Sequence, residues 1–308
     1  MKNQITFSKA IEGYLLNAQA RRLSPHTIAD YTNTFRKFQA HLDQDLPISQ
    51  ITKDHIRSFL AVQTVSKKTL LNYHTGLSAL WSWAFNEGFV IENIVQLVAR
   101  PKPEKRSITP FSEADIRTML SNLEISTTYS RPGKRISAHS LPNAERNRAI
   151  LLLLLDTGIR ASELCDLRHK DLDMKNARIT VNGKGSKQRI LPFSPRTGQA
   201  IWRYVAIQIS ANPNDTLFQT IENQPMDRDR LYKIISKIGN RANIKDCHPH
   251  RFRHTFAILY LRNKGDPWSL QRMLGHATME MVSNYLAIAQ ADMDASHRSA
   301  SPVENLRL

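Results

Sequence analysis

The sequence predicts a mainly α-helical protein of two domains with one small β-hairpin. Apolar residues recur at helical spacing along most of the 308 residues, whereas strand-like alternation surrounds a single glycine-rich turn. A basic, proline-containing segment separates two stretches that are each long enough to enclose a core. We therefore expect a helical domain at 1–99, a linker at 100–108, a mixed α+β domain at 109–298 and a polar tail at 299–308.

The overall charge indicates the kind of partner. The formal net charge is +16 and the isoelectric point is about 10, which favours a polyanion, most simply nucleic acid. An acidic membrane surface is the competing partner, but no basic amphipathic helix or lipidation motif supports it. The longest apolar run, Ala149 to Leu155, is too short to span a bilayer. The beginning of the chain lacks a secretory signal, and two cysteines give no disulfide framework, so we expect a cytoplasmic protein alongside DNA.

Helix signals are clear in the first domain. Ser24-Pro25 predicts one helix start, Thr52 or Asp54 a second and Ser66 a third, whose helix ends near Gly88. Basic residues lie beside two of these starts and are candidates for contacts with DNA phosphates, the alternative being a solvated surface. They are Arg21, Arg22, Lys67 and Lys68.

Two connecting segments follow. The stretch Arg100 to Arg106 is stiffened by prolines, and its basic side chains, Lys102 among them, are well placed to cross a DNA backbone. Residues 125 to 143 are rich in Ser, Thr, Pro and Gly and predict an irregular loop. We expect that loop to be mobile, the alternative being contact with DNA or a neighbouring subunit.

The first candidate functional residue of the second domain is an arginine in a position that suits anion binding. A leucine-rich helix from Asn147 to Asp156 breaks at Gly158, and Arg160 stands at the start of the next helix. Helical N–H groups and an arginine converge there, as in many anion sites. Glu163, three residues further on, could orient the arginine, although an ordinary surface arginine would give the same pattern.

The glycine-rich turn lies between Arg178–Val181 and Gln188–Leu191, whose alternation predicts a β-hairpin. Lys184 lies at its tip, flanked by glycines, where it could enter a DNA groove or simply be solvated. Lys187 and Arg189 of the same hairpin are further candidate DNA contacts.

The stretch from His248 to Tyr285 carries the densest group of reactive side chains. Pro249 suits the first turn of a helix, on which His250 and Arg253 share a face. His254 lies on much the same side, four residues after His250. A Leu-Gly-His turn and a helix reaching Tyr285 then supply His276 and a tyrosine. An arginine can clamp phosphate oxygens, a histidine can donate or shuttle a proton and a tyrosine can attack, so this set suits a phosphate.

Simpler interpretations remain at this point. A tyrosine on an apolar helix is usually a core residue, and a single histidine is usually structural. Cys247, His248 and His250 could suggest zinc, but no second Cys/His group has ligand spacing and Cys165 stands alone. We therefore expect neither a metal nor another cofactor.

Several motifs together resemble a known family. H-x-x-R followed by L-G-H, with a tyrosine nine residues after that histidine, is similar to the active-site signature of the tyrosine recombinases, the phage-integrase family. T-G-I-R-A-S-E-L resembles that family's first arginine box and N-G-K-G-S-K-Q-R-I-L-P its lysine hairpin. S-P-H-T-I-A-D-Y and W-S-W-A-F-N-E-G resemble its helical core-binding domain. The resemblance is to integrases of the Xer and phage type and extends over nearly the whole chain.

The resemblance implies a function. It makes the chain a site-specific DNA recombinase that forms a 3′-phosphotyrosyl intermediate without metal or ATP. Tyr285 would be the nucleophile, His250 its proton acceptor and Lys184 the acid for the leaving oxygen. Arg160, Arg253 and His276 would hold the phosphate. The implied partner is double-stranded DNA with inverted core-type sites, bound by a protein that is monomeric in solution and tetrameric in the synapse. The alternatives are a type IB topoisomerase or an inactive DNA-binding protein.

Overall fold

The chain divides into two compact units, Met1–Ser107 and Ile108–Leu308, at the end of the predicted linker. The computed structural model describes residues 5–104, 108–123, 143–183, 188–208, 212–301 and 303. The predicted loop at 125–143 thus lies almost entirely outside the described residues. Within the described part of the chain, no helix is long and apolar enough to cross a membrane.

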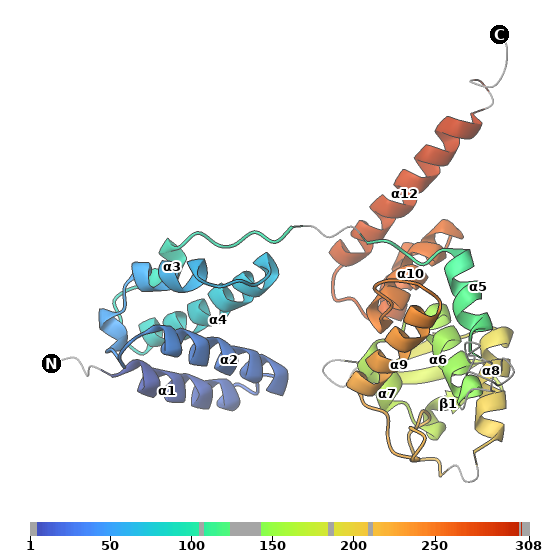
Figure 1. Cartoon of the computed structure of the whole chain (residues 1–308), viewed down its shortest axis with the longest axis horizontal. Helices are drawn as coiled ribbons and strands as arrows, with labels where there is room; N and C mark the ends of the chain where they lie inside the picture. Colours follow the sequence, from blue (N-terminus) through green and yellow to red (C-terminus); the bar gives the residue numbers. More distant parts are fainter. Residues whose placement is uncertain are drawn as a thin grey trace, which may run out of the picture. The chain divides into compact units, whose positions relative to one another are not determined.

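The first unit is a bundle of helices (Figure 1). Its helices are α1 (Phe7–Ala20), α2 (Pro25–His41), α3 (Lys53–Ala61) and α4 (Lys67–Asn86). The predicted starts are confirmed: Ser24 caps α2 by accepting from the Thr27 N–H, and Ser66 caps α4 by accepting from the Thr69 N–H.

Aromatic side chains form the core of this bundle. Phe38 is fully buried and packs edge-on against Phe7, Phe59 and Trp81, with ring centroids 5.2–6.1 Å apart. Because these rings come from α1, α2, α3 and α4, they fix the helices against one another. They thereby also fix the starts of α2 and α4, beside which the predicted basic residues lie.

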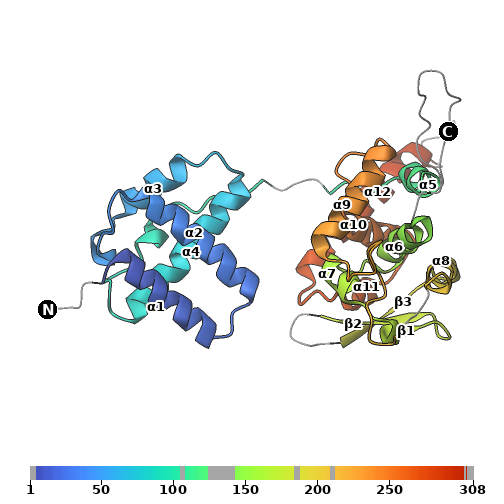
Figure 2. The ribbon, with the colours of Figure 1, turned by 60° about the horizontal axis from the view of Figure 1, so that its bottom comes forward.

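The second unit combines helices with one small sheet (Figures 1 and 2). Its helices are α5 (Glu113–Ser121), α6 (Ala144–Thr157), α7 (Ala161–Asp166), α8 (Pro195–Ala206), α9 (Arg228–Arg241), α10 (Pro249–Arg262), α11 (Pro267–Leu274) and α12 (Glu280–Ala300). The strands β1 (Leu172–Asp173), β2 (Arg178–Asn182) and β3 (Gln188–Pro192) form an antiparallel sheet in that order.

The sheet confirms the predicted hairpin and extends it. Ile179 of β2 pairs with Leu191 of β3, and both are fully buried in the core of the unit. Strand β1 was not predicted, because two residues are too few to show alternation. Strand β3 lies along α11, so the hairpin borders the segment that carries the Leu-Gly-His turn.

Helix α12 extends beyond the predicted helix. The sequence predicted a helix reaching Tyr285, and the observed helix runs through this tyrosine and continues to Ala300. Val282, Tyr285 and Leu286 attach its first turns to α10 and α11. Figure 1 shows the remainder of α12 projecting from the helices of the second unit.

Candidate active site

The break between α6 and α7 positions the first arginine. Gly158 ends α6 in the left-handed conformation with φ of 60°, and a Cβ there would come within 2.3 Å of the Phe256 ring. A glycine is therefore required by both backbone conformation and space. The turn places Arg160 at the start of α7 and presents the Gly158 carbonyl to Arg253, whose Nη1 donates to it at 2.7 Å.

Glu163 connects two arginines. Its Oε1 accepts from Arg160 Nη1 at 2.9 Å, which confirms the predicted orienting role, and its Oε2 accepts from the Arg160 N–H. Arg189 makes a bidentate pair with the same carboxylate, with both N···O distances at 2.7 Å. The Glu163 side chain is buried, but these bonds outweigh the cost of desolvation and lower its pKa to about 2. Glu163 is therefore ionised at neutral pH.

Backbone carbonyls at the C-terminal end of α11 accept hydrogen bonds from three arginines. Met273 O accepts from Arg189, Leu274 O from Arg253 and Gly275 O from Arg160, at 2.6–2.8 Å. Carbonyls at a helix C-terminus carry partial negative charge, which suits guanidinium groups. Gly275 ends α11 with φ of 62°, and a Cβ there would lie 3.3 Å from nitrogens of Arg160 and Arg189.

These three residues, Arg160, Arg189 and Arg253, are called the arginine cluster below. An arginine carries more N–H donors than the bonds described for Arg160 and Arg253 use. Both arginines can therefore bind an anion while they keep their hydrogen bonds within the protein. Burial and the charge of Arg160 lower the pKa of Arg253 to about 10, so Arg253 remains charged at neutral pH.

His276 lies against Arg253. Arg253 Nη2 and His276 Nε2 are 2.9 Å apart, and because arginine can only donate, Nε2 must be the acceptor. Burial and the charge of Arg253 lower the pKa of His276 to about 4, so the ring is neutral and its proton lies on Nδ1. Within the described residues Nδ1 is buried without a hydrogen-bond partner. This nitrogen is a donor available to a ligand.

Tyr285 enters the site from α12 and is 1% exposed. Its hydroxyl lies 2.7 Å from Nδ1 of His254, and its ring is stacked 6.4 Å from that of His276. The sequence suggested His250 as the partner of this tyrosine. In the structure the partner is His254, one helical turn further along α10, and the rings of His250 and His254 meet at 4.2 Å.

These residues, His250, His254, His276 and Tyr285, are called the histidine–tyrosine cluster below. Burial and the charge of His250 lower the pKa of His254 to about 4. His250 is exposed as a residue, but desolvation of its ring in the site and the charge of Arg253 lower its pKa as well. Burial raises the pKa of Tyr285, although Arg253 opposes the shift. The cluster is therefore uncharged at neutral pH.

The residues considered for zinc have other partners. His248 caps α10, its Nδ1 accepting from the Arg251 N–H at 3.1 Å. Cys247 is buried with its sulfur 3.6 Å from that of Met119. No group of three potential metal ligands occurs among the residues that the structure describes.

The other predicted residues divide into three groups. Arg21, Arg22, Lys67, Lys68 and Lys102 are exposed in the first unit, where Lys67 is paired with Glu104. Lys184 and Lys187 lie outside the described residues. Arg189, expected on the DNA side of the hairpin, instead points inward with its side chain 13% exposed, because the buried Glu163 carboxylate requires a counter-charge.

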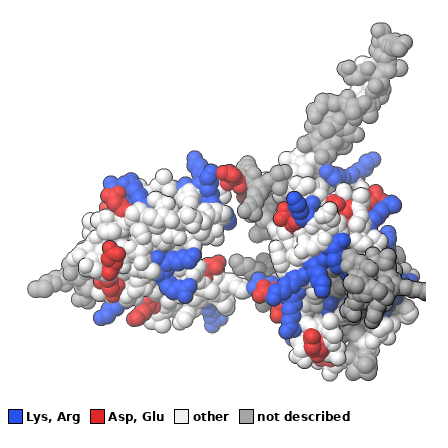
Figure 3. All heavy atoms as spheres, in the orientation of Figure 1, with Lys and Arg blue, Asp and Glu red and all other residues white. Residues whose placement is uncertain are grey.

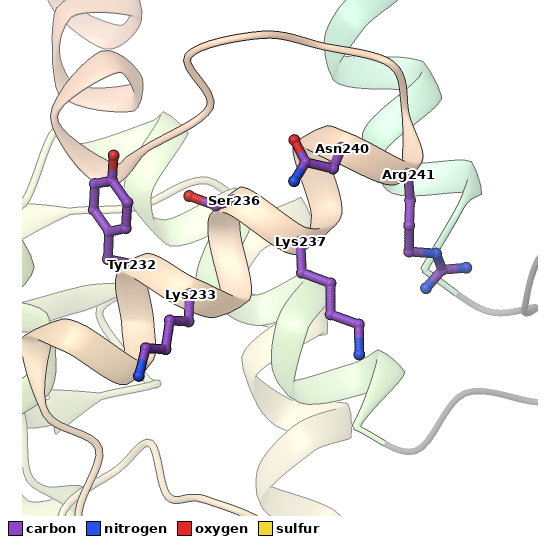
Figure 4. Close-up of a pocket in the computed structure, with 6 residues that line it drawn as sticks. All are labelled: Tyr232, Lys233, Ser236, Lys237, Asn240 and Arg241. Atoms are coloured by element: carbon purple, nitrogen blue, oxygen red, sulfur yellow. The ribbon is translucent and has the colours of Figure 1, made fainter.

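The sequence analysis missed a polar surface on α9. Figure 3 shows Lys and Arg side chains gathered over the part of the second unit that carries this helix. Figure 4 shows two rows at i, i+4 spacing around a shallow pocket. One row is Tyr232, Ser236 and Asn240, and the other is Lys233, Lys237 and Arg241. The spacing of the basic row is visible in the sequence and could have revealed it.

Comparison with known proteins agrees with this architecture. Residues 109–292 match the family model described as Phage integrase family, and residues 11–64 match its N-terminal SAM-like domain. The protein named Tyrosine recombinase XerC from Bacillus pumilus (strain SAFR-032) is 27% identical over 295 residues, covering 92% of each chain.

Two solved structures share the fold. The Tn1549 transposon integrase in complex with a circular intermediate DNA is 21% identical, with a TM-score of 0.72 and coverage of 93% of this chain and 99% of that one. A lambda integrase tetramer bound to a Holliday junction is 17% identical, with a TM-score of 0.74 and coverage of 92% and 78%.

Proposed function

Since the chain belongs to the phage integrase family, we propose that it is a site-specific tyrosine recombinase, which cuts and rejoins DNA through a covalent phosphotyrosyl link. The observation that carries this proposal is the convergence of Arg160, Arg253, His276 and Tyr285 in one site of the second unit. A general DNA-binding protein has no need of a buried tyrosine beside two anchored arginines.

The arginines hold the scissile phosphate. Arg160 and Arg253 use their remaining donors for its non-bridging oxygens and stabilise the charge that develops there. His276 donates its Nδ1 hydrogen to a phosphate oxygen, which satisfies a buried polar atom. His250, exposed at the edge of the cluster, contacts the phosphate from the solvent side.

Tyr285 is the nucleophile. Its Oη attacks phosphorus, the bond to the 5′ oxygen breaks, and a 3′-phosphotyrosyl link with a free 5′-hydroxyl results. Lys184 protonates the departing 5′ oxygen, since an alkoxide is a poor leaving group. The link conserves the energy of the phosphodiester, so the partner strand's 5′-hydroxyl reverses the attack without ATP or metal.

DNA is held by basic surfaces on both units. The row formed by Lys233, Lys237 and Arg241 on α9 binds phosphates, which position the protein but carry no sequence information. The parallel row of Tyr232, Ser236 and Asn240 supplies side chains that can read base edges. In the first unit, the side chains of Lys67 and Lys68 at the start of α4 bind further phosphates.

The assembly follows from the chemistry. Each active site cuts one strand, so exchange of two duplexes through a Holliday junction requires four copies on inverted core-type sites. We assign that tetramer to the synapse and a monomer to the free protein, which acts in the cytoplasm. The lambda integrase tetramer on a Holliday junction, a chain of the same fold, supports this assembly.

Two steps test the proposed function. Mapping covalent protein–DNA adducts across the host replicon identifies the cleavage site. A supercoiled plasmid with two such sites is then incubated with the protein without metal or ATP. Recombined circles are the predicted product. Relaxation alone would indicate a type IB topoisomerase, and binding alone an inactive site.

A further inference from the structure

His254 contacts the proposed nucleophile, Tyr285, but the sequence motifs assign it no role. It lies on α10, in contact with the first turns of α12. Its Nδ1 is 2.7 Å from the Tyr285 hydroxyl, a distance typical of a good hydrogen bond, and the two rings are 5.6 Å apart. No other hydrogen bond to that hydroxyl is described. The nucleophile's hydroxyl is therefore already hydrogen-bonded to one histidine.

The protonation state of His254 makes it an acceptor. Burial lowers its pKa, and so do the neighbouring positive or titratable groups, which are His248, His250, Arg253 and His276. With its pKa at about 4, the ring is neutral at pH 7 and one ring nitrogen bears a lone pair. Tyr285, whose pKa is raised by burial, keeps its proton and can donate it to Nδ1.

We propose that His254 is a further catalytic residue of the recombination reaction, whose Nδ1 accepts the phenolic proton as Tyr285 attacks phosphorus. This inference rests on the proposed function. The Oη–H bond breaks as the Oη–P bond forms, the bond from phosphorus to the 5′ oxygen breaks as that oxygen takes the proton of Lys184, and His254 becomes an imidazolium. In the reverse step the partner strand's 5′-hydroxyl attacks phosphorus and gives its proton to the amine of Lys184, the Oη–P bond breaks, and Nδ1 returns the proton to the phenol.

The surrounding charges connect this step to DNA binding. In the free protein, burial and the charge of Arg253 disfavour a positive charge on His254, so the proton remains on Tyr285. A bound phosphodiester brings negative charge beside Arg253 and offsets its effect on the imidazolium. His254 therefore becomes a stronger base only when a phosphate is in place, which keeps the nucleophile unreactive in the absence of DNA.

The test makes the nucleophile more acidic. His254→Asn keeps a polar atom near the position of Nδ1 but removes the base, so adduct formation on a nicked suicide substrate should fall by about 10²-fold or more. Placing a fluorinated, more acidic tyrosine at position 285 should then restore the rate to within about tenfold of the wild type, since general-base help matters less for an acidic phenol. A purely structural defect would not respond to phenol acidity.

Matched variants make the outcomes distinct. His254→Gln serves as the second variant, and gel-shift affinity and thermal unfolding verify that each protein is folded. His250→Asn should lose rate without rescue by the fluorinated tyrosine. Rescue confined to His250→Asn, or a wild-type rate in folded His254→Asn and His254→Gln, would overturn the inference alone. Absence of any adduct with wild-type protein on its mapped site would overturn the proposed function itself.

Discussion

The arginine cluster and the histidine–tyrosine cluster are held in the site by different means. The three guanidinium groups are charged and anchored by Glu163 and by the carbonyls at the end of α11. The three histidines and the tyrosine are neutral, and burial rather than ion pairing sets their state. Phosphate binding is thus organised before DNA arrives, whereas nucleophile activation depends on the charge that DNA brings.

Replacing an anchored arginine should have a large effect on the phosphate-binding side of this contrast. Arg253→Lys keeps a positive charge but loses the planar fork that contacts Gly158 O, Leu274 O and His276. Adduct formation should slow by about 10²–10³-fold while DNA affinity stays similar. Arg251→Lys is the control. Arg251 also lies on α10, and its side chain also donates hydrogen bonds to backbone carbonyls. Equal losses in both variants would remove the special role of Arg253.

Lys184 offers a test that separates the leaving group from the nucleophile. Lys184→Ala should cleave an ordinary phosphodiester about 10²–10⁴-fold more slowly. It should recover on a substrate with sulfur at the 5′-bridging position, because a thiolate leaves more easily than an alkoxide. Arg253→Lys should not recover, since its charge acts on non-bridging oxygens. Lys187→Ala is the control, and rescue of Lys187→Ala alone would mean that the wrong lysine was chosen.

Removing the shared carboxylate should loosen the arginine cluster. Glu163→Gln leaves Arg189 and Arg160 without their counter-charge, and we expect the free energy of unfolding to fall by about 3 kcal/mol. This is the low end for a broken buried pair, because Arg160 is partly exposed. Glu113→Gln, which breaks an exposed pair on α5, should change nothing measurable.

The same variant gives a pH test. The folded-state pKa of Glu163 is lowered to about 2 from 4.5, so its stabilisation is fully present above pH 4.5 and is lost as pH falls toward 2. The stability difference between wild type and Glu163→Gln should therefore shrink over that interval in urea titrations. A constant difference from pH 7 to pH 2 would contradict the ionised carboxylate.

The smallest effect is expected on α9, whose side chains belong to neither cluster. Lys237→Ala should weaken DNA binding on all sequences and reduce the slope of log affinity against log salt by about one. Asn240→Ala should instead change the preference among bases. Lys175→Ala, which removes the same charge from the turn between β1 and β2, is the control. Identical salt slopes for Lys237→Ala and wild type would exclude α9 from the phosphate contact.

Local rules predicted the helices well and the side-chain partners less well. Capping and left-handed turns depend on a few neighbouring residues, so the sequence predicts the helix starts at Ser24 and Ser66 and the helix end at Gly158. His250 and His254 share one side of α10, so only the approach of α12 decides which of them meets Tyr285. Spacing along a single helix contains no information about that approach.

The hairpin shows the same limit. Hydrophobicity would favour Ile190 inward and Arg189 outward, but Arg189 shares a face with the buried Leu191 and points inward, whereas Ile190 is 58% exposed. The buried carboxylate of Glu163, distant in sequence, reverses the usual preference. Pair interactions between distant residues can therefore override a local pattern.

The most direct test of this account identifies the residue joined to DNA. A nicked suicide substrate traps the adduct, and mass spectrometry of the digested protein locates the modified side chain. We predict a single DNA-linked tyrosine at position 285, and no SDS-resistant adduct from Tyr285→Phe despite unchanged binding. An adduct that persists in Tyr285→Phe, or a link to Tyr260, would contradict the assignment of the nucleophile and the division of the site described above.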